Sequence, residues 1–293
     1  MRIGTFGTTD RRHRLGRVEG HAAKRKVRMS LPVTRPRTTA VTVQVKGMVG
    51  DDERDCAQAL VSAVLSRHRA AVGPARVRVT GAPGAGGSGL VQVNLSVCGA
   101  PARVQVPGDT LPLAIATAAA RLDRQIKRLT TAWDPWPWPD PERRAVSGPG
   151  AGPIARRKTV RLHVGMACQA AAILDAMDYD VYLYTDADTG EDAIVYRAGP
   201  TGLALARQRT MRPPSLPRLL PLTVNPRRTP VMTADQAAAW LAEHWLPFVF
   251  YTDRDTRRGT LLYRRYDGDL GLVAPATRGR DGQPRRLVVG GIG

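Results

Sequence analysis

An internal repeat constrains the fold of this 293-residue chain more than any other feature of its sequence. Shifting the chain by 67 positions aligns residues 166–205 with residues 233–272 without a gap. Such a repeat indicates two copies of one structural unit. We predict that the matched tyrosines, aspartates and arginines are structural and serve the pairing of the two units. They are Tyr184, Asp186, Asp188, Tyr196 and Arg197 in the first copy, and Tyr251, Asp253, Asp255, Tyr263 and Arg264 in the second.

Each unit is predicted to be a short helix, over 167–177 or 234–245, followed by strands. The segments between the strands, DADTGED and DRDTRRG, resemble the start of a calcium loop. A calcium loop needs oxygen ligands across about twelve residues and a final glutamate. The second copy instead has Arg257 and Arg258 where the first has Gly190 and Glu191. We therefore predict no metal site, and hairpin turns whose aspartates bond their own backbone.

Residues 39–133 alternate between apolar and polar side chains over four short segments, 41–47, 75–81, 90–97 and 102–106. A period of two predicts half-buried strands with one apolar face. Two helices fit around them. One runs over about 52–71 with acidic residues at its start, and the other runs from an N-cap at Asp109 to about 132. The order is β-α-β-β-β-α, with both helices on the apolar face of the sheet.

Cations mark two surfaces of this domain. The polar sheet face carries Lys46, Arg76, Arg78 and Arg103, and it has no aromatic residue. The second helix carries Arg121, Arg124 and Arg128 on the side roughly opposite its apolar stripe, with Lys127 at the edge. Such cations hold phosphates without reading sequence. A face without stacking rings argues against an RRM-type reader of single strands, so we predict structured RNA as the ligand.

Composition agrees with a polyanionic partner, because the net charge is +19 and the pI is about 11.1. The three cysteines, Cys56, Cys98 and Cys168, form no CxxC, which predicts reduced thiols and a cytoplasmic location. No apolar run is long enough for a membrane helix. A formal GxGxxG at Gly84, Gly86 and Gly89 joins two strands, so we interpret it as a hairpin loop. No P-loop, HExxH or GxSxG motif is present, and we predict neither enzymatic activity nor a cofactor.

The chain is predicted to be α+β, with a βαβββα domain followed by two tandem α+β repeats. Tryptophans Trp133, Trp136 and Trp138 either pack on the first domain or stack on a base or partner. The basic arm is predicted to be disordered, and translation could instead begin at Met29. The predicted segments are a basic arm (1–38), the βαβββα domain (39–133), a Pro/Gly-rich linker (134–158), repeat 1 (159–207), a Pro-rich linker (208–228), repeat 2 (229–276) and a disordered tail (277–293).

Three stretches together resemble a known family. They are ARLDRQIKRL (120–129), the Pro-rich linker, and YRRYDGDLGLVAP (263–275). The combination resembles the long-form hibernation promoting factors, bacterial ribosome-associated translation inhibitors. The doubled half, with DAMDYDVYLYTDADTGEDAIVYRAGPTGLALARQ (175–208), is similar to the dormancy-associated, hypoxia-induced translation inhibitors of mycobacteria.

The resemblance implies a mechanism. The N-terminal domain of the family occupies the mRNA and tRNA channel of the small ribosomal subunit near the decoding centre, halting translation and protecting the ribosome. The match at ARLDRQIKRL implies that Arg121, Arg124, Lys127 and Arg128 contact ribosomal RNA. A general structured-RNA-binding protein or RNA chaperone is the alternative, and a nuclease on a basic scaffold is a third reading.

The doubled C-terminal half departs from the ordinary long forms. In those proteins a single C-terminal domain pairs with its copy on another ribosome, which gives inactive ribosome dimers. Here there are two copies, and the first has YRAGPTG at 196–202 in place of the YRRxDG motif. We hypothesise that the two copies pair within one chain. The protein would then be a monomer that does not dimerise ribosomes.

Overall fold

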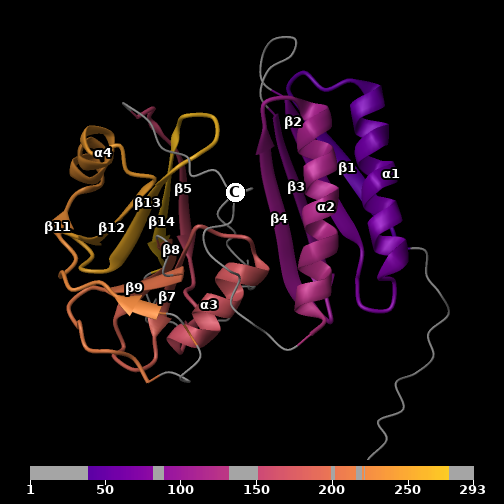
Figure 1. Ribbon diagram of the computed structural model, residues 1–293. Helices are drawn as coiled ribbons and strands as arrows, with labels where there is room; N and C mark the ends of the chain where they lie inside the picture. Colours follow the sequence, from indigo (N-terminus) through magenta and orange to yellow (C-terminus); the bar gives the residue numbers. More distant parts are fainter. Residues whose placement is uncertain are drawn as a thin grey trace, which may run out of the picture. The chain divides into compact units, whose positions relative to one another are not determined.

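The computed structural model describes residues 39–81, 89–131, 151–198, 202–215, 220 and 222–276, and it is a mixed α+β fold as predicted (Figure 1). Its N-terminal elements form a four-stranded sheet in the order β1-β2-β3-β4, in which only β1 and β2 are parallel. Two helices accompany the sheet. The elements are β1 (Val41–Lys46), α1 (Asp51–Arg67), β2 (Ala75–Gly81), β3 (Gly89–Val97), β4 (Ala100–Gly108) and α2 (Leu111–Leu129).

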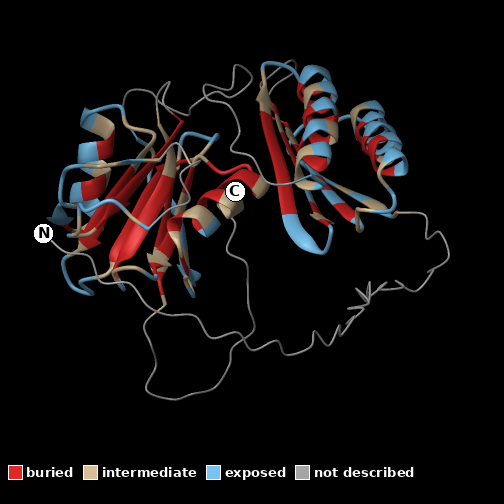
Figure 2. Ribbon diagram, turned by 60° about the horizontal axis from the view of Figure 1, so that its bottom comes forward, coloured by how far each residue is buried: buried red, intermediate tan, exposed pale blue. Residues whose placement is uncertain are grey.

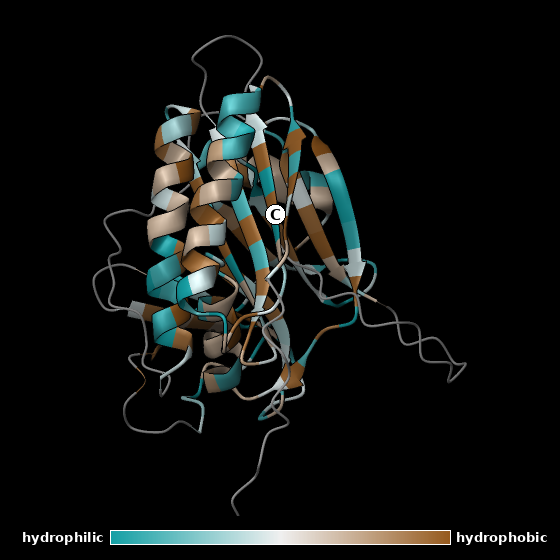
Figure 3. Ribbon diagram, turned by 90° about the vertical axis from the view of Figure 1, so that its right-hand side faces the viewer, coloured by the Kyte–Doolittle hydropathy of each residue, from teal (hydrophilic) through white to brown (hydrophobic). Residues whose placement is uncertain are grey.

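The alternation seen in the sequence corresponds to the two faces of this sheet. In β2, Val77 and Val79 are buried while Arg76 and Arg78 are exposed. Both helices lie over the same face, and hydrophilic and hydrophobic residues alternate along the strands (Figure 3). The core therefore lies between the sheet and the helices. The opposite face is left to polar side chains.

The helix boundaries differ slightly from those predicted. The N-cap of α2 is Thr110 rather than Asp109, and Pro112 follows in the first turn, where a missing N–H costs nothing. Acidic residues Asp51, Asp52 and Glu53 fill the first turn of α1, as predicted from the helix dipole. Both helices end several residues before the predicted positions, at Arg67 and Leu129.

Two five-stranded sheets make up the C-terminal half, in the orders β10-β9-β8-β7-β6 and β11-β12-β13-β14-β5. Each sheet is accompanied by one helix of ten residues, α3 or α4. The elements are β5 (Ile154–Val160), β6 (Val164–Gly165), α3 (Ala167–Ala176), β7 (Val181–Asp186), β8 (Asp192–Ala198), β9 (Gly202–Arg207), β10 (Leu222–Val224), β11 (Val231–Met232), α4 (Ala234–Glu243), β12 (Phe248–Asp253), β13 (Gly259–Arg264) and β14 (Leu270–Pro275).

The two repeats exchange their leading strands. Strand β5 precedes repeat 1 but lies parallel to β14, the last strand of repeat 2. Strand β10 precedes repeat 2 but lies parallel to β9, the last strand of repeat 1. The two leading strands are equivalent, because residues 222–224 lie 67 positions after residues 155–157. Strand β10 lies in a segment predicted to be a linker, and β5 begins in the other predicted linker and ends within predicted repeat 1.

Three apolar clusters hold this half together. Repeat 1 has its own core around Tyr184, and repeat 2 has its own around Tyr251, both with no exposed surface. The third cluster joins residues of both repeats, among them Leu183 and Ile194 of repeat 1 and Phe250 and Leu261 of repeat 2. Figure 2 shows that the strands of both sheets are largely buried. The repeats thus share a continuous apolar interior, which favours their association.

The aspartate-rich turns between the strands are backbone turns. The N–H of Asp188 donates to Asp186 Oδ1 over 3.0 Å, and the N–H of Thr256 donates to Asp253 Oδ1 over 2.9 Å. The predicted role of the first aspartate in each turn is therefore confirmed. Asp186 is also buried against Arg207, whose Nε donates to its Oδ2. Asp255 is exposed.

Several predictions fall outside the described residues. They concern the basic arm and its start at Met29, the loop glycines Gly84 and Gly86, the tryptophans Trp133, Trp136 and Trp138, and the tail after residue 276. Among the residues that are described, no helix is long and apolar enough to cross a membrane.

Candidate nucleic-acid interface

The sheet face opposite the helices carries two rows of polar side chains, which are exposed on β1 and β2 but largely buried on β4. The strand register aligns Thr42, Arg76, Asn94 and Arg103 in one row, and Gln44, Arg78, Gln92 and Gln105 in the next. Gln92 Nε2 donates to Gln105 Oε1 over 2.6 Å, which ties neighbouring strands together on this face. Neither row contains an aromatic ring. The exposed part of the face, on β1 and β2, therefore offers hydrogen bonds and charge rather than base stacking.

Five of the eight predicted RNA contacts face solvent. Lys46, Arg76 and Arg78 are exposed on the sheet side, and Arg124 is exposed on α2. The side chain of Lys127 is 66% exposed, although its Nζ lies 2.7 Å from Asp123 Oδ2. Because α2 packs on the other face of the sheet, these cations occupy two sides of the domain rather than one continuous stripe.

Asp123 is the centre of an ion cluster that ties α1 to α2. Its Oδ1 lies 3.2 Å from Arg67 Nη2 and 2.9 Å from His68 Nε2, at the end of α1. Hydrogen bonds to Lys127, His68 and Arg67 hold the pKa of the Asp123 carboxyl well below its ordinary range. The cluster stabilises the packing of the two helices, and the neighbouring Arg124 is exposed.

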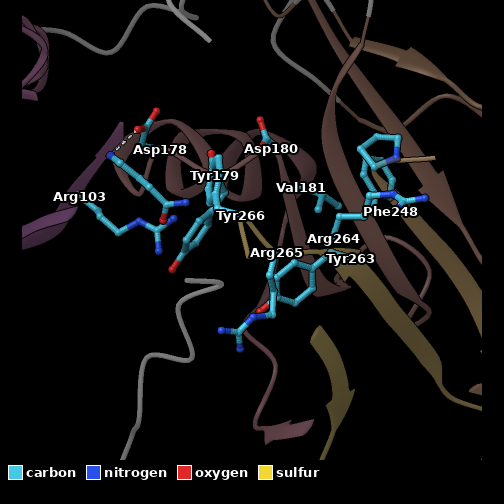
Figure 4. A pocket seen from close by; sticks show the side chains of 12 residues that line it. Arg103, Asp178, Tyr179, Asp180, Val181, Phe248, Tyr263, Arg264, Arg265 and Tyr266 are labelled. Carbon is cyan, nitrogen blue, oxygen red and sulfur yellow. Dashed lines mark hydrogen bonds between the residues drawn. The ribbon is translucent and has the colours of Figure 1, made fainter. Parts of the chain in front are cut away.

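The other three predicted contacts are covered by repeat 1. Arg121 is only 7% exposed, and the prediction that it lies on a solvent-facing stripe is wrong. Its Nη2 lies 2.9 Å from Asp178 Oδ1. Arg128 Nη1 lies 3.3 Å from Asp175 Oδ2. Arg103 is 5% exposed and stacks on the ring of Tyr179, 4.7 Å from its centroid (Figure 4).

Arg197 and Arg264, which occupy equivalent positions in the two repeats, are structural. Arg197 Nε donates to the carbonyl of Tyr179 over 3.2 Å, and Arg264 Nε donates to the carbonyl of Leu246 over 2.8 Å. These two carbonyls lie 67 residues apart, so the same bond occurs in both copies. Each arginine fastens the loop after the helix of its own unit to the sheet. This geometry agrees with the structural role predicted for this pair.

The matched tyrosines also lie inside the C-terminal half. Tyr184 and Tyr251 are completely buried, and burial raises the pKa of both hydroxyls. Tyr196 meets Phe248 of the other repeat edge to face, with the ring centroids 5.4 Å apart. Tyr263 belongs to the apolar cluster shared by the two repeats.

An ion pair that the sequence analysis did not identify joins the two repeats. Asp192, at the start of β8, accepts from Arg258 Nε over 2.7 Å and from Arg258 Nη2 over 3.0 Å. It also accepts from the N–H of Gly259 over 2.9 Å. Asp192 and Gly259 are equivalent positions, 67 residues apart. A Cβ on Gly259 would lie 2.6 Å from Asp192 Cβ, so the contact requires different residues in the two copies.

A cleft lies where the N-terminal domain and both repeats approach one another (Figure 4). Its lining includes Arg103, Asp178, Tyr179, Tyr263 and Arg265. Lys158, on β5, is close to several of these cations. Burial, together with Arg156, Arg103 and Arg265, lowers the pKa of the Lys158 amine to about 8.

Two signals in the sequence could have revealed the contacts that were missed. Both are positions at which the copies of the repeat differ in charge. Asp178 and Asp192 of repeat 1 correspond to Trp245 and Gly259 of repeat 2. A unit that needs a carboxylate in only one of its copies indicates a contact outside that unit.

The chain is similar to several known proteins. The model of the family described as "Sigma 54 modulation/S30EA ribosomal protein C terminus" matches residues 150–205, which span β5 to β9. The chain is also 50% identical over 218 residues to proteins called "Dormancy associated translation inhibitor" from two strains of Mycobacterium tuberculosis. The match covers 72% of this chain and 80% of each relative. The chain belongs to the family of the dormancy associated translation inhibitor. Membership of this family of translation inhibitors also confirms that the chain is not an enzyme.

Two solved structures are similar to part of this member of the dormancy associated translation inhibitor family. One is the N-terminal domain of Protein Y from Thermus thermophilus, with 22% identity, a TM-score of 0.26, and coverage of 31% of this chain and 99% of that one. The other is a ribosomal subunit interface protein from Coxiella burnetii, with 15% identity, a TM-score of 0.24, and coverage of 30% and 96%.

Proposed function

We propose that this protein is a ribosome hibernation factor. Its N-terminal domain, residues 39–133, binds the small ribosomal subunit in the mRNA and tRNA channel near the decoding centre. There it blocks mRNA and tRNA, inhibits translation in the cytoplasm and protects ribosomes during dormancy or hypoxia. The observation that carries the proposal is the 50% identity over 218 residues to a relative named as a dormancy associated translation inhibitor.

The exposed cations supply the first contacts with ribosomal RNA in this proposal. Lys46, Arg76 and Arg78 lie on one side of the domain, and Arg124 and Lys127 lie on the other. A plug inserted into a channel with RNA walls meets phosphates on both sides. The distribution of these cations over two sides therefore supports insertion better than binding to a single flat surface. Such contacts recognise the RNA backbone and its shape.

Co-sedimentation with purified small subunits tests this proposal. The variant R76E/R78E/R124E is expected to lose binding at about 0.1 M salt, since each cation contributes through counterion release. The variant R227E/R228E/R254E reverses three exposed arginines of the C-terminal half and has the same net charge, so it should bind like the wild type. Equal binding by the two variants would contradict the proposal. Displacement of the wild type by excess tRNA would favour a general RNA-binding protein.

The two repeats pair within one chain in this proposal, which leaves a monomer on the ribosome. The reciprocal exchange of β5 and β10 and the shared apolar cluster support it. The ion pair of Asp192 with Arg258 supports it further, because the two repeats make unequal contributions. Pairing of repeat 1 with repeat 1 of another chain would bring Asp192 against Asp192, and like charges in a buried site repel strongly.

Sedimentation of ribosomes in sucrose gradients tests whether the protein binds as a monomer and leaves ribosomes undimerised. Ribosomes incubated with a molar excess of the protein are expected to sediment as single particles that carry the protein. A peak of ribosome dimers that depends on the protein would show pairing between chains.

A further inference from the structure

The end of helix α3 in repeat 1 lies against arginines that are predicted to bind RNA. Asp178 follows this helix and is 7% exposed. Its Oδ1 accepts from Arg121 Nη2 over 2.9 Å, and its Oδ2 accepts from the backbone N–H of Gln105 over 2.8 Å. Strand β4 is the last strand of its sheet, so this N–H points to a carboxylate instead of another strand. One aspartate thus binds both the helix and the sheet edge of the N-terminal domain.

A second set of contacts surrounds the same helix end. Asp175 Oδ2 lies 3.3 Å from Arg128 Nη1. Gln125 Nε2 donates to the backbone carbonyls of Asp175 over 2.7 Å and of Ala176 over 3.2 Å. The last carbonyls of a helix carry partial negative charge. Two carboxylates and a helix terminus therefore present oxygen acceptors to Arg121 and Arg128, as an RNA phosphate backbone would.

The second repeat lacks these acidic groups. Residues Ala242 and Trp245 occupy the positions equivalent to Asp175 and Asp178. Trp245 has a φ of 54°, close to the 52° of Asp178, so the left-handed backbone of the unit forms without an aspartate. The local fold of the repeat therefore does not explain Asp178. Its contacts with Arg121 and Gln105 do explain it.

We propose that the acidic end of α3, formed by Asp175 and Asp178, is an autoinhibitory contact that competes with RNA phosphates for Arg121 and Arg128. The inference rests on the proposed function, because the competing ligand is ribosomal RNA. Arg121 is too buried to reach a phosphate until α3 moves away. Arg76, Arg78 and Arg124 stay exposed in the closed form and make the first contact. Binding then proceeds by exchange of carboxylates for phosphates.

In the closed form Asp175 and Asp178 contact Arg128 and Arg121, and in the open form these contacts are broken. The apparent affinity for RNA is the affinity of the open form multiplied by the fraction of molecules that are open. If about a tenth of the molecules are open, removal of the contact tightens binding about tenfold. The variant D178N removes the charge and retains a residue that tolerates the left-handed backbone. D178G also suits this backbone and serves as a second variant. Neither variant alters a cation that is expected to touch RNA.

The experiment measures the affinity of the full chain for purified small ribosomal subunits at about 0.1 M salt, in the range where phosphate contacts dominate. The control is E243Q on α4, which removes one carboxylate from an exposed position of repeat 2 and so gives the same net charge. D178N and D178G are expected to bind about tenfold more tightly than the wild type, and E243Q about as the wild type does. Equal affinities for D178N, D178G and E243Q would overturn the inference.

Hydrogen exchange of the free proteins provides the second measurement. The amide of Gln105 is expected to exchange faster in D178N than in the wild type, because its acceptor is weakened. Equal exchange would mean that the contact does not form in solution, and the inference would fail. If wild type and variants all fail to bind small subunits while the Gln105 amide responds as expected, the proposed function fails instead, and RNA is not the competitor.

Discussion

Replacement of Asp192 by alanine removes the carboxylate that joins repeat 1 to repeat 2. The Asp192 carboxylate is 3% exposed and accepts two bonds from Arg258, one from the N–H of Gly259 and one from Thr185 Oγ1 over 3.2 Å. Its removal leaves a guanidinium and a backbone N–H without this acceptor at the junction of the repeats. Breaking a buried ion pair from one side costs about 3–5 kcal/mol.

Because Arg258 is partly exposed, the cost of removing Asp192 should lie at the lower end of this range. The Arg258 side chain is 33% exposed, so water can solvate part of the freed guanidinium. We therefore expect D192A to lower the free energy of unfolding by about 3 kcal/mol. For a unit of this size, about 1 kcal/mol lowers the melting temperature by about 3–5 °C, which predicts a fall of about 10 °C.

A double-mutant cycle isolates the pair from other effects. D192A, R258A and the double variant are compared by urea unfolding of the full chain, and R228A controls for the loss of an exposed arginine. A coupling energy of about 1–3 kcal/mol is expected for residues in direct contact. Additive losses, or a D192A variant as stable as R228A, would refute the reasoning that this contact joins the repeats.

Three further predictions concern charge. K158M is expected to be more stable than the wild type at pH 7, because folding lowers the pKa of the Lys158 amine from 10.5 to about 8. The difference in the free energy of unfolding should shrink between about pH 8 and pH 10.5, as the wild-type amine loses its proton. Urea unfolding at several pH values would check this, and a difference that did not change with pH would contradict it. D123A is expected to cost about 1–2 kcal/mol at pH 7, because the folded state depresses the pKa of this carboxyl. The stability difference between D123A and the wild type should disappear as the pH falls below about 4, because the Asp123 carboxylate then becomes protonated. Thermal unfolding at several pH values measures this, and a difference that stayed constant would contradict the ion-pairing role of Asp123. R76A and R78A are each expected to reduce the slope of log affinity for small subunits against log salt by about 1, and an unchanged slope would exclude them as phosphate contacts.

The sequence predicted those features that local pattern determines. Alternating valines identify strands such as β2, and the ungapped offset identifies the two repeats and their equivalent turns. Strand β5 was missed because its sequence, IARRKTV, shows no alternation of apolar residues. It joins the outer edge of a sheet, where pairing depends on backbone hydrogen bonds rather than on a buried apolar face.

The burial of Arg121 could not be predicted from helical periodicity. A charged residue away from the apolar stripe is expected to face solvent, as Arg124 does. Arg121 instead meets Asp178, 57 residues away, and only tertiary contact determines this pairing. The candidate site was therefore identified by residue type, whereas its division into exposed and covered cations required the structure.

A cryo-EM map of the full chain on its small ribosomal subunit tests the central claim most directly. The account predicts density for the N-terminal domain inside the mRNA and tRNA channel, with Arg76 and Arg124 near RNA on opposite sides. Well-occupied density for the domain outside that channel, or contacts made only with ribosomal proteins, would contradict it.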